Sequence, residues 1–124
     1  MDTRSLQQVG GTLFVSLPAE WCVEHNLRKG SRVRIVYSDK PAIVILPEDS
    51  HIQVDGLTTV RLLQTIGTAL HTSLPKAWVQ RFSLQRKDSV DLKWEPGSQE
   101  VGSSILILST NKSPASYERK IIGE

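Results

Sequence analysis

The sequence predicts a mainly β protein in which two copies of one β-hairpin, short helix and β-hairpin unit share a single core. Three observations predict this fold class: the chain repeats itself at a spacing of 57 residues, glycine-containing turns divide its strand-like segments, and each copy has room for one short helix. A chain of 124 residues suffices for one ordinary domain, whereas one repeat alone is too small to bury its own apolar face. We therefore expect both repeats to fold together as one composite domain.

The repeat aligns residues 4–37 with residues 61–94 without a gap. The identical positions include the pairs Trp21/Trp78 and Leu17-Pro18/Leu74-Pro75. Beyond this stretch a length difference of five residues brings residues 43–46 onto residues 105–108, and we expect it in a hairpin loop, where insertions are tolerated. The predicted organisation is repeat 1 at 1–47, a linker at 48–58, repeat 2 at 59–110 and a C-terminal tail at 111–124.

Each copy predicts the same series of elements. In the first copy we expect strands at 4–9 and 12–17, a helix at 18–26, and strands at 32–37 and 42–47. Gly10 and Gly67 divide the first hairpins, because a two-residue hairpin turn needs a residue with positive φ. Proline is favoured at the first position of a helix, so Pro75 predicts that the second helix covers 75–83. By the repeat, strands are expected after it at 89–94 and 104–109. The linker contains one short strand-like run at 51–54.

Apolar spacing along both short helices predicts one buried stripe on each. Trp21 and Trp78 are expected to anchor the core, and Cys22 to be a small half-buried apolar residue. His25 aligns with Phe82, which predicts a packing position for this histidine. In the turn after the helix, the second repeat has Lys87 where the first repeat has Gly30. A lysine in the left-handed backbone region costs on the order of 1 kcal/mol of stability, so we expect a different turn in the second repeat.

A resemblance to a known family follows from these residues. The sequence resembles the AbrB/MazE/SpoVT swapped-hairpin domain and looks most like its archaeal members. The residues that carry the resemblance are Gly10-Gly11-Thr12, Ser16-Leu17-Pro18, Trp21 and Leu27-Arg28-Lys29-Gly30. In that family two copies interleave their hairpins into one barrel. The resemblance therefore implies that this tandem duplication forms the barrel within one chain.

The resemblance also implies a function, that of a DNA-binding transcriptional regulator in contact with double-stranded DNA through the first hairpins of both repeats. Long polar side chains can reach phosphates and base edges, and the second copy carries a basic outer helix face. The distribution of charge also favours DNA contact through the second half of the chain. Residues 58–124 hold nine Lys/Arg against six Asp/Glu, whereas residues 1–57 hold six against seven. The expected DNA-binding residues are Arg4, Gln7, Gln8, Thr12, Arg61, Gln64, Lys76 and Arg81.

The alternative is a protein-interaction module, such as an antitoxin or an adaptor with weak DNA binding, whose C-terminal tail contacts a protein partner. An enzyme is not expected, because the three histidines lack metal-ligand spacing and no phosphate-binding loop or nucleophile motif occurs. The sequence predicts no cofactor, no metal and no membrane partner. We expect a cytoplasmic, nucleoid-associated protein in which further homodimerisation is open.

Overall fold

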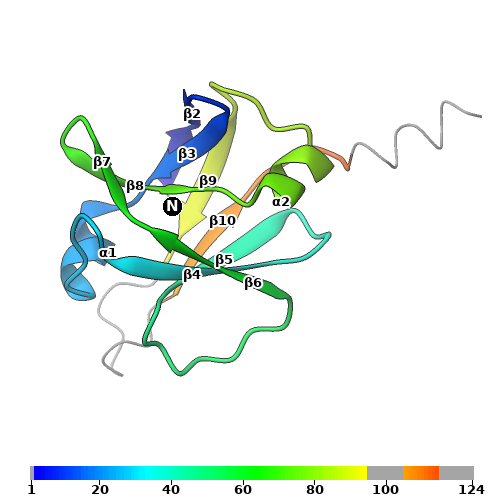
Figure 1. Ribbon diagram of the computed structural model, residues 1–124. Coiled ribbons are helices and arrows are strands. Elements are labelled where there is room, and N and C mark those ends of the chain that lie inside the picture. Colours follow the sequence, from blue (N-terminus) through cyan, green and yellow to red (C-terminus); the bar gives the residue numbers. More distant parts are fainter. Residues whose placement is uncertain (1, 95–104, 115–124) are drawn as a thin grey trace, which may run out of the picture.

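The computed structural model describes residues 2–94 and 105–114, which form two antiparallel sheets and two short helices (Figure 1). The described elements follow the chain in the order β1 (Asp2–Ser5), β2 (Gln7–Val9), β3 (Thr12–Ser16), α1 (Ala19–Glu24), β4 (Arg32–Tyr37), β5 (Ala42–Pro47), β6 (Leu57–Leu62), β7 (Gln64–Ile66), β8 (Ala69–Ser73), α2 (Lys76–Arg81), β9 (Ser89–Lys93) and β10 (Leu106–Ser109). The predicted tail at 111–124 lies mostly outside the described residues.

Each sheet combines strands from both repeats. The six-stranded sheet has the order β1-β9-β10-β5-β4-β6, and the four-stranded sheet the order β2-β3-β8-β7. Both orders are unchanged when every strand is exchanged for its counterpart in the other repeat, so a pseudo-twofold axis relates the repeats. The first strand of each repeat pairs with the other repeat, β1 with β9 and β6 with β4. This exchange confirms the expected mainly β, swapped pseudo-dimeric architecture.

The pseudo-twofold axis passes between equivalent residues in both sheets. In the four-stranded sheet Val15 lies opposite its own counterpart, Thr72. In the six-stranded sheet the central pair is Val44 and Ile107, between β5 and β10. Because both sheets are centred on one axis, the barrel is a single symmetric unit built from two unlike sequences.

The hairpin that closes each repeat differs from the expectation by one residue. Ile35 pairs with Ile45, and its counterpart Leu92 pairs with Leu108. Ile45 and Leu108 are therefore equivalent and lie 63 residues apart, so the length difference is six residues and the expected match of 43–46 to 105–108 is wrong. A one-residue slip exchanges the two faces of a strand. Both strands are apolar on both faces, so the sequence alone could not fix this register.

The first predicted strand of each repeat bends from one sheet into the other. The expected strand at 4–9 is divided into β1 and β2, and the bend is at Leu6. Its counterpart Leu63 separates β6 from β7. Both leucines are 1% exposed, so the bend is held by a buried side chain of the core.

Both helices are shorter than the predicted 18–26 and 75–83, because Asn26 and Ser83 adopt positive φ values of 56° and 52° and end them. Trp21 and Trp78 are buried, as expected, at 0% and 1% exposure. The His25 ring packs tilted against that of Trp21, with 5.0 Å between ring centroids, and Phe82 packs tilted against Trp78 at 5.5 Å. The equivalent positions thus perform the same packing task with a histidine in one half and a phenylalanine in the other.

The linker between the repeats packs on the outer face of the six-stranded sheet. The Arg34 guanidinium donates to the carbonyls of Ser50 and Ile52, at 2.8 and 3.3 Å. The strand-like run predicted at 51–54 is not a strand, because these residues cross the sheet face and pair with no neighbouring strand. At Gly56 (φ 143°) a Cβ atom would lie 2.8 Å from the Tyr37 carbonyl oxygen, so this close approach requires glycine.

Candidate nucleic-acid interface

The predicted glutamines lie on the four-stranded sheet, on the face opposite the main core. Gln7 pairs with Phe14 and Gln64 with His71, so these four residues share one face. Leu13 and its alternate neighbours belong to the core on the other face. Gln7 and Gln64 are exposed, and Thr12 is exposed at the start of β3. The two first hairpins therefore lie side by side through β3 and β8 and present both glutamines to solvent.

The predicted arginines of this surface are held at the rim. Arg61 Nη1, on β6, donates to the hydroxyl of Ser73, the last residue of β8, at 3.4 Å. Its counterpart Arg4 forms an ion pair with Asp2 at 3.5 Å, and both arginine side chains are partly buried. Each guanidinium thus already has an intramolecular partner. A role of Arg4 and Arg61 in binding stays a prediction.

A groove brings Gln8 together with Lys76, although they belong to different repeats. It lies between the turn of the β2–β3 hairpin and the outer side of α2, and has a volume of about 600 Å³. Arg86 and Lys87, from the loop after α2, line the same groove. The lining residues are Gln8, Gly11, Leu13, Lys76, Val79, Gln80, Leu84, Gln85, Arg86 and Lys87. Among the described residues, three cations and no acid line this groove, so it is suited to an anionic ligand.

The loop after α2 is strained at one of these cations. Lys87 adopts φ 76°, close to the 86° of its counterpart Gly30. The expectation of a different turn is therefore wrong: the fold imposes the same turn on a lysine that it imposes on a glycine. A non-glycine residue in this region costs on the order of 1 kcal/mol. The loop thus carries a cation where the fold favours glycine.

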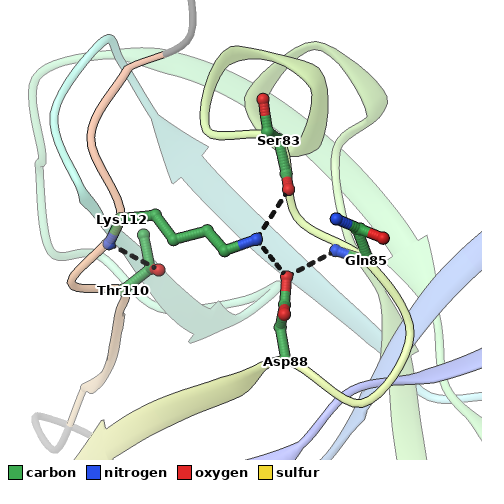
Figure 2. A network of polar contacts seen from close by, with 5 residues as sticks. All are labelled: Ser83, Gln85, Asp88, Thr110 and Lys112. Carbon is green, nitrogen blue, oxygen red and sulfur yellow. Dashed lines mark hydrogen bonds and ion pairs between the residues drawn. The ribbon is translucent and has the colours of Figure 1, made fainter.

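A polar network holds this loop (Figure 2). The Asp88 carboxylate accepts a hydrogen bond from the Gln85 backbone N–H at 2.7 Å and forms an ion pair with Lys112 at 2.7 Å. The Lys112 ammonium also donates to the Ser83 carbonyl at 2.9 Å, so the segment after β10 is tied to the end of α2. Partial burial on its own would raise the pKa of Asp88, but the Lys112 and Gln85 contacts outweigh it and hold this pKa below its usual value.

The first half carries a different set of residues at the equivalent positions. Lys76, Gln80 and Lys87 are replaced there by Ala19, Val23 and Gly30. Val23 is 79% exposed on the outer side of α1. The pseudo-dimer therefore has one basic helix face and one apolar to acidic helix face, which a homodimer could not have.

Arg81 lies apart from the groove. It lines a separate hollow with Tyr37, Leu57 and Trp78, near the start of β6. Of the residues selected from the sequence, Gln8 and Lys76 line the groove and Arg81 does not. Arg86 and Lys87 also line the groove, although the sequence analysis did not select them for DNA binding. Lys87 did carry a signal, namely a lysine aligned with a glycine, but its position in a groove depended on the exchange between repeats.

The other titratable side chains of the described residues provide neither a metal site nor a reactive thiol. Burial raises the pKa of the Cys22 thiol to about 11, which keeps it protonated and unreactive near neutral pH. In residues 2–94 and 105–114 no three His, Cys, Asp or Glu side chains gather where a metal could be held. No helix in that part of the chain is long and apolar enough to cross a membrane.

Comparison with known proteins assigns the first half of the chain. Residues 6–53 match the family model described as antidote-toxin recognition MazE, bacterial antitoxin. These residues are thus similar to the AbrB/MazE-type swapped-hairpin family. The second repeat lies outside the match, and it joins this domain through the exchanged strands β1 and β6. Searches of curated proteins and of solved structures returned no match. The chain thus contains a DNA-binding or antitoxin-type domain.

Proposed function

We propose that the protein is a DNA-binding transcriptional regulator that contacts double-stranded DNA asymmetrically, mainly through its second half. The observation that carries this proposal is the groove in which Lys76, Arg86 and Lys87 gather beside Gln8 without an acidic residue. Cations that converge on one surface favour a phosphate backbone, and the neighbouring hairpins offer glutamine side chains for base edges. The proposed setting is the cytoplasm, in association with the nucleoid.

The protein would make two kinds of contact with DNA, one to phosphates and one to base edges. The groove cations would position the duplex through its phosphates, which carries no sequence information. Gln7 and Gln64 are exposed on the adjacent sheet face and would read base edges. Arg4, Arg61 and Thr12 would contribute at the rim. Arg81 lines another hollow, so its contact with DNA would be the weakest of the predicted set.

The test is fluorescence anisotropy with double-stranded genomic fragments at several salt concentrations. Arg86→Ala and Lys29→Ala form a matched pair, because the two residues occupy equivalent positions in the two repeats. Removal of Arg86 should lower the slope of log K against log salt by about 0.9, the value for one phosphate contact, while Lys29→Ala leaves it unchanged. The double variant Arg4→Ala, Arg61→Ala reports on the rim in the same assay.

Three results would contradict the proposal in whole or in part. An absence of binding to any fragment at low salt would remove DNA as the ligand. Equal loss of slope in Arg86→Ala and Lys29→Ala would keep DNA but remove the asymmetry. Loss of binding in the rim variant alone would move the contact surface to Arg4 and Arg61.

The second candidate function is that of an antitoxin, which the printed description of the matching family favours. In that reading the tail at 111–124 would bind a protein partner, and residues 115–124 of it lie outside the described structure. Deletion of residues 115–124 should then abolish capture of the partner while DNA binding persists. Unchanged capture by the truncated chain would exclude the tail as the contact.

A further inference from the structure

One ammonium group holds both ends of a loop that lines the basic groove. This groove loop follows α2 and consists of Leu84, Gln85, Arg86 and Lys87, which all line the groove. Ser83 precedes the loop and Asp88 follows it. The Lys112 ammonium donates to the Ser83 carbonyl at 2.9 Å and forms an ion pair with the Asp88 carboxylate at 2.7 Å (Figure 2). We call this arrangement the Lys112 clamp, and the loop that it closes carries two of the three groove cations.

The residue that forms the clamp is itself held by the rest of the fold. The Lys112 N–H donates to the Thr110 hydroxyl at 3.2 Å, and Thr110 is 8% exposed. The Thr110 N–H donates in turn to the Pro41 carbonyl at 2.9 Å, in the turn between β4 and β5. The clamp therefore connects the groove loop to a hairpin of the first repeat.

The last residue of the groove loop is held in the same way in both repeats. The Lys87 N–H donates to the Leu6 carbonyl and the Gly30 N–H donates to the Leu63 carbonyl, both at 2.9 Å. These contacts belong to the exchange between repeats and are common to both halves. They therefore do not account for the additional contacts of Lys112.

Among the described residues, the clamp belongs to the second half alone. Ser31 occupies the position of Asp88, and its hydroxyl accepts from the Arg28 N–H at 2.9 Å, so the first repeat keeps this loop contact without a charge. At the offset of 63 residues that relates β5 to β10, Lys112 corresponds to Asp49, an acid. The fold thus closes this turn without a clamp in the first half, and the clamp accompanies the half that has the basic groove.

Backbone strain in the groove loop gives the clamp a physical role. Lys87 holds φ 76°, where the first repeat has a glycine at 86°. A strained conformation persists only when the surrounding structure holds it. The clamp fixes both ends of the loop and so restricts alternatives in which the Arg86 and Lys87 side chains leave the groove.

We propose that Lys112, acting through Asp88, is a positioning residue that holds the groove cations in place for a phosphate backbone. This inference rests on the proposed DNA binding through the groove. Neither Lys112 nor Asp88 is among the residues that line the groove, so their effect on DNA is indirect. Without the clamp the groove loop has to be ordered when DNA binds, and this ordering costs binding free energy.

Asp88→Ser separates positioning from simple attraction, because the two predict opposite results. The substitution removes an acid adjacent in sequence to a groove cation, so attraction by net charge alone would strengthen DNA binding. It also breaks the ion pair with Lys112 but keeps a hydroxyl for the Gln85 N–H, as Ser31 provides in the first repeat. We expect the affinity for double-stranded genomic fragments to fall about fivefold or more, because loop ordering then opposes binding.

Asp49→Ser is the matched control. It makes the same change of charge at an exposed position of the first half and should leave the DNA affinity equal to wild type or slightly higher. Lys112→Met should weaken binding as Asp88→Ser does. The double variant should bind no more weakly than Lys112→Met alone, because both substitutions remove the same ion pair. An Asp88→Ser variant that binds DNA as tightly as wild type, or more tightly, would overturn the proposal.

NMR relaxation of the backbone amides tests the clamp without DNA. In Asp88→Ser and in Lys112→Met the order parameters of the groove loop should fall, while those of the equivalent residues 27–30 stay unchanged. Order parameters that keep their wild-type values in both variants would overturn the proposal. If the wild-type chain binds no DNA but the groove loop loosens in both variants, DNA is rejected as the ligand of the groove and the clamp is supported.

Discussion

Replacement of Lys87 by glycine is expected to stabilise the protein. Lys87 holds φ 76° in a turn where the first repeat has Gly30 at φ 86°. Relief of the left-handed strain contributes about 1–2 kcal/mol, and the greater freedom of glycine in the unfolded chain offsets about 0.5–1 kcal/mol of it. The net expectation is a gain of about 0.5–1 kcal/mol, or roughly 2–5 °C in Tm for a chain of this size.

The reverse substitution supplies the matched control. Nothing lies within 4 Å of the place where a Cβ atom on Gly30 would be, so Gly30→Lys meets strain without a clash and should cost a similar amount. Urea unfolding of both variants measures the two free energies. If the central proposal on DNA also holds, Lys87→Gly should weaken DNA binding while it stabilises the fold. A Lys87→Gly variant that is less stable than wild type would refute the strain argument.

Three further predictions concern the core and the polar network. Trp78→Ala should destabilise the protein by about 3–5 kcal/mol, because it removes a buried side chain whose indole N–H also donates to the Lys40 carbonyl at 2.9 Å. Denaturant unfolding measures this loss, and a loss below about 1 kcal/mol would contradict the role of Trp78 in the core. Cys22, whose pKa burial raises to about 11, should react with a thiol reagent at pH 8 only when the protein unfolds, and rapid labelling of the native protein would contradict its burial. The pKa of Asp88 is lowered in the folded state. Its contribution to folding stability is therefore present above the ordinary aspartate pKa of about 3.9 and is lost as the pH falls through the folded value. Asp88→Asn should cost stability at about pH 7 and almost none near pH 2, and an equal cost at both pH values would exclude the charge as the cause.

The sequence predicted the fold well where local chemistry and the repeat agree. The hairpin turns follow from Gly10 and Gly67, which adopt φ 61° and 65°, and the buried tryptophans follow from the apolar spacing of the helices. It failed where only the tertiary structure decides. The register of β10 was missed because apolar residues occupy both faces of β5 and β10, and the linker was read as partly strand-like although it packs across a sheet.

The candidate site was less predictable than the fold. Gln8 and Lys76 were selected separately, and only the exchange of hairpins between repeats places them in one groove. Arg86 was missed because it lies in the loop after α2, outside the hairpins and the helix face from which the expected residues were selected. Contacts between residues so distant in sequence depend on topology, which periodicity does not report.

Site-directed DNA cleavage tests the asymmetric contact most directly. Gln80 lines the basic groove and Val23 is its counterpart on α1, so a cleavage reagent is tethered to Gln80→Cys or to Val23→Cys, each in a Cys22→Val background that follows Val79 of the second repeat. The proposal predicts strand cleavage from position 80 at defined sites of a bound fragment and little or none from position 23. Equal cleavage from both positions, or cleavage from position 23 alone, would contradict the claim that the second half of the pseudo-dimer meets DNA.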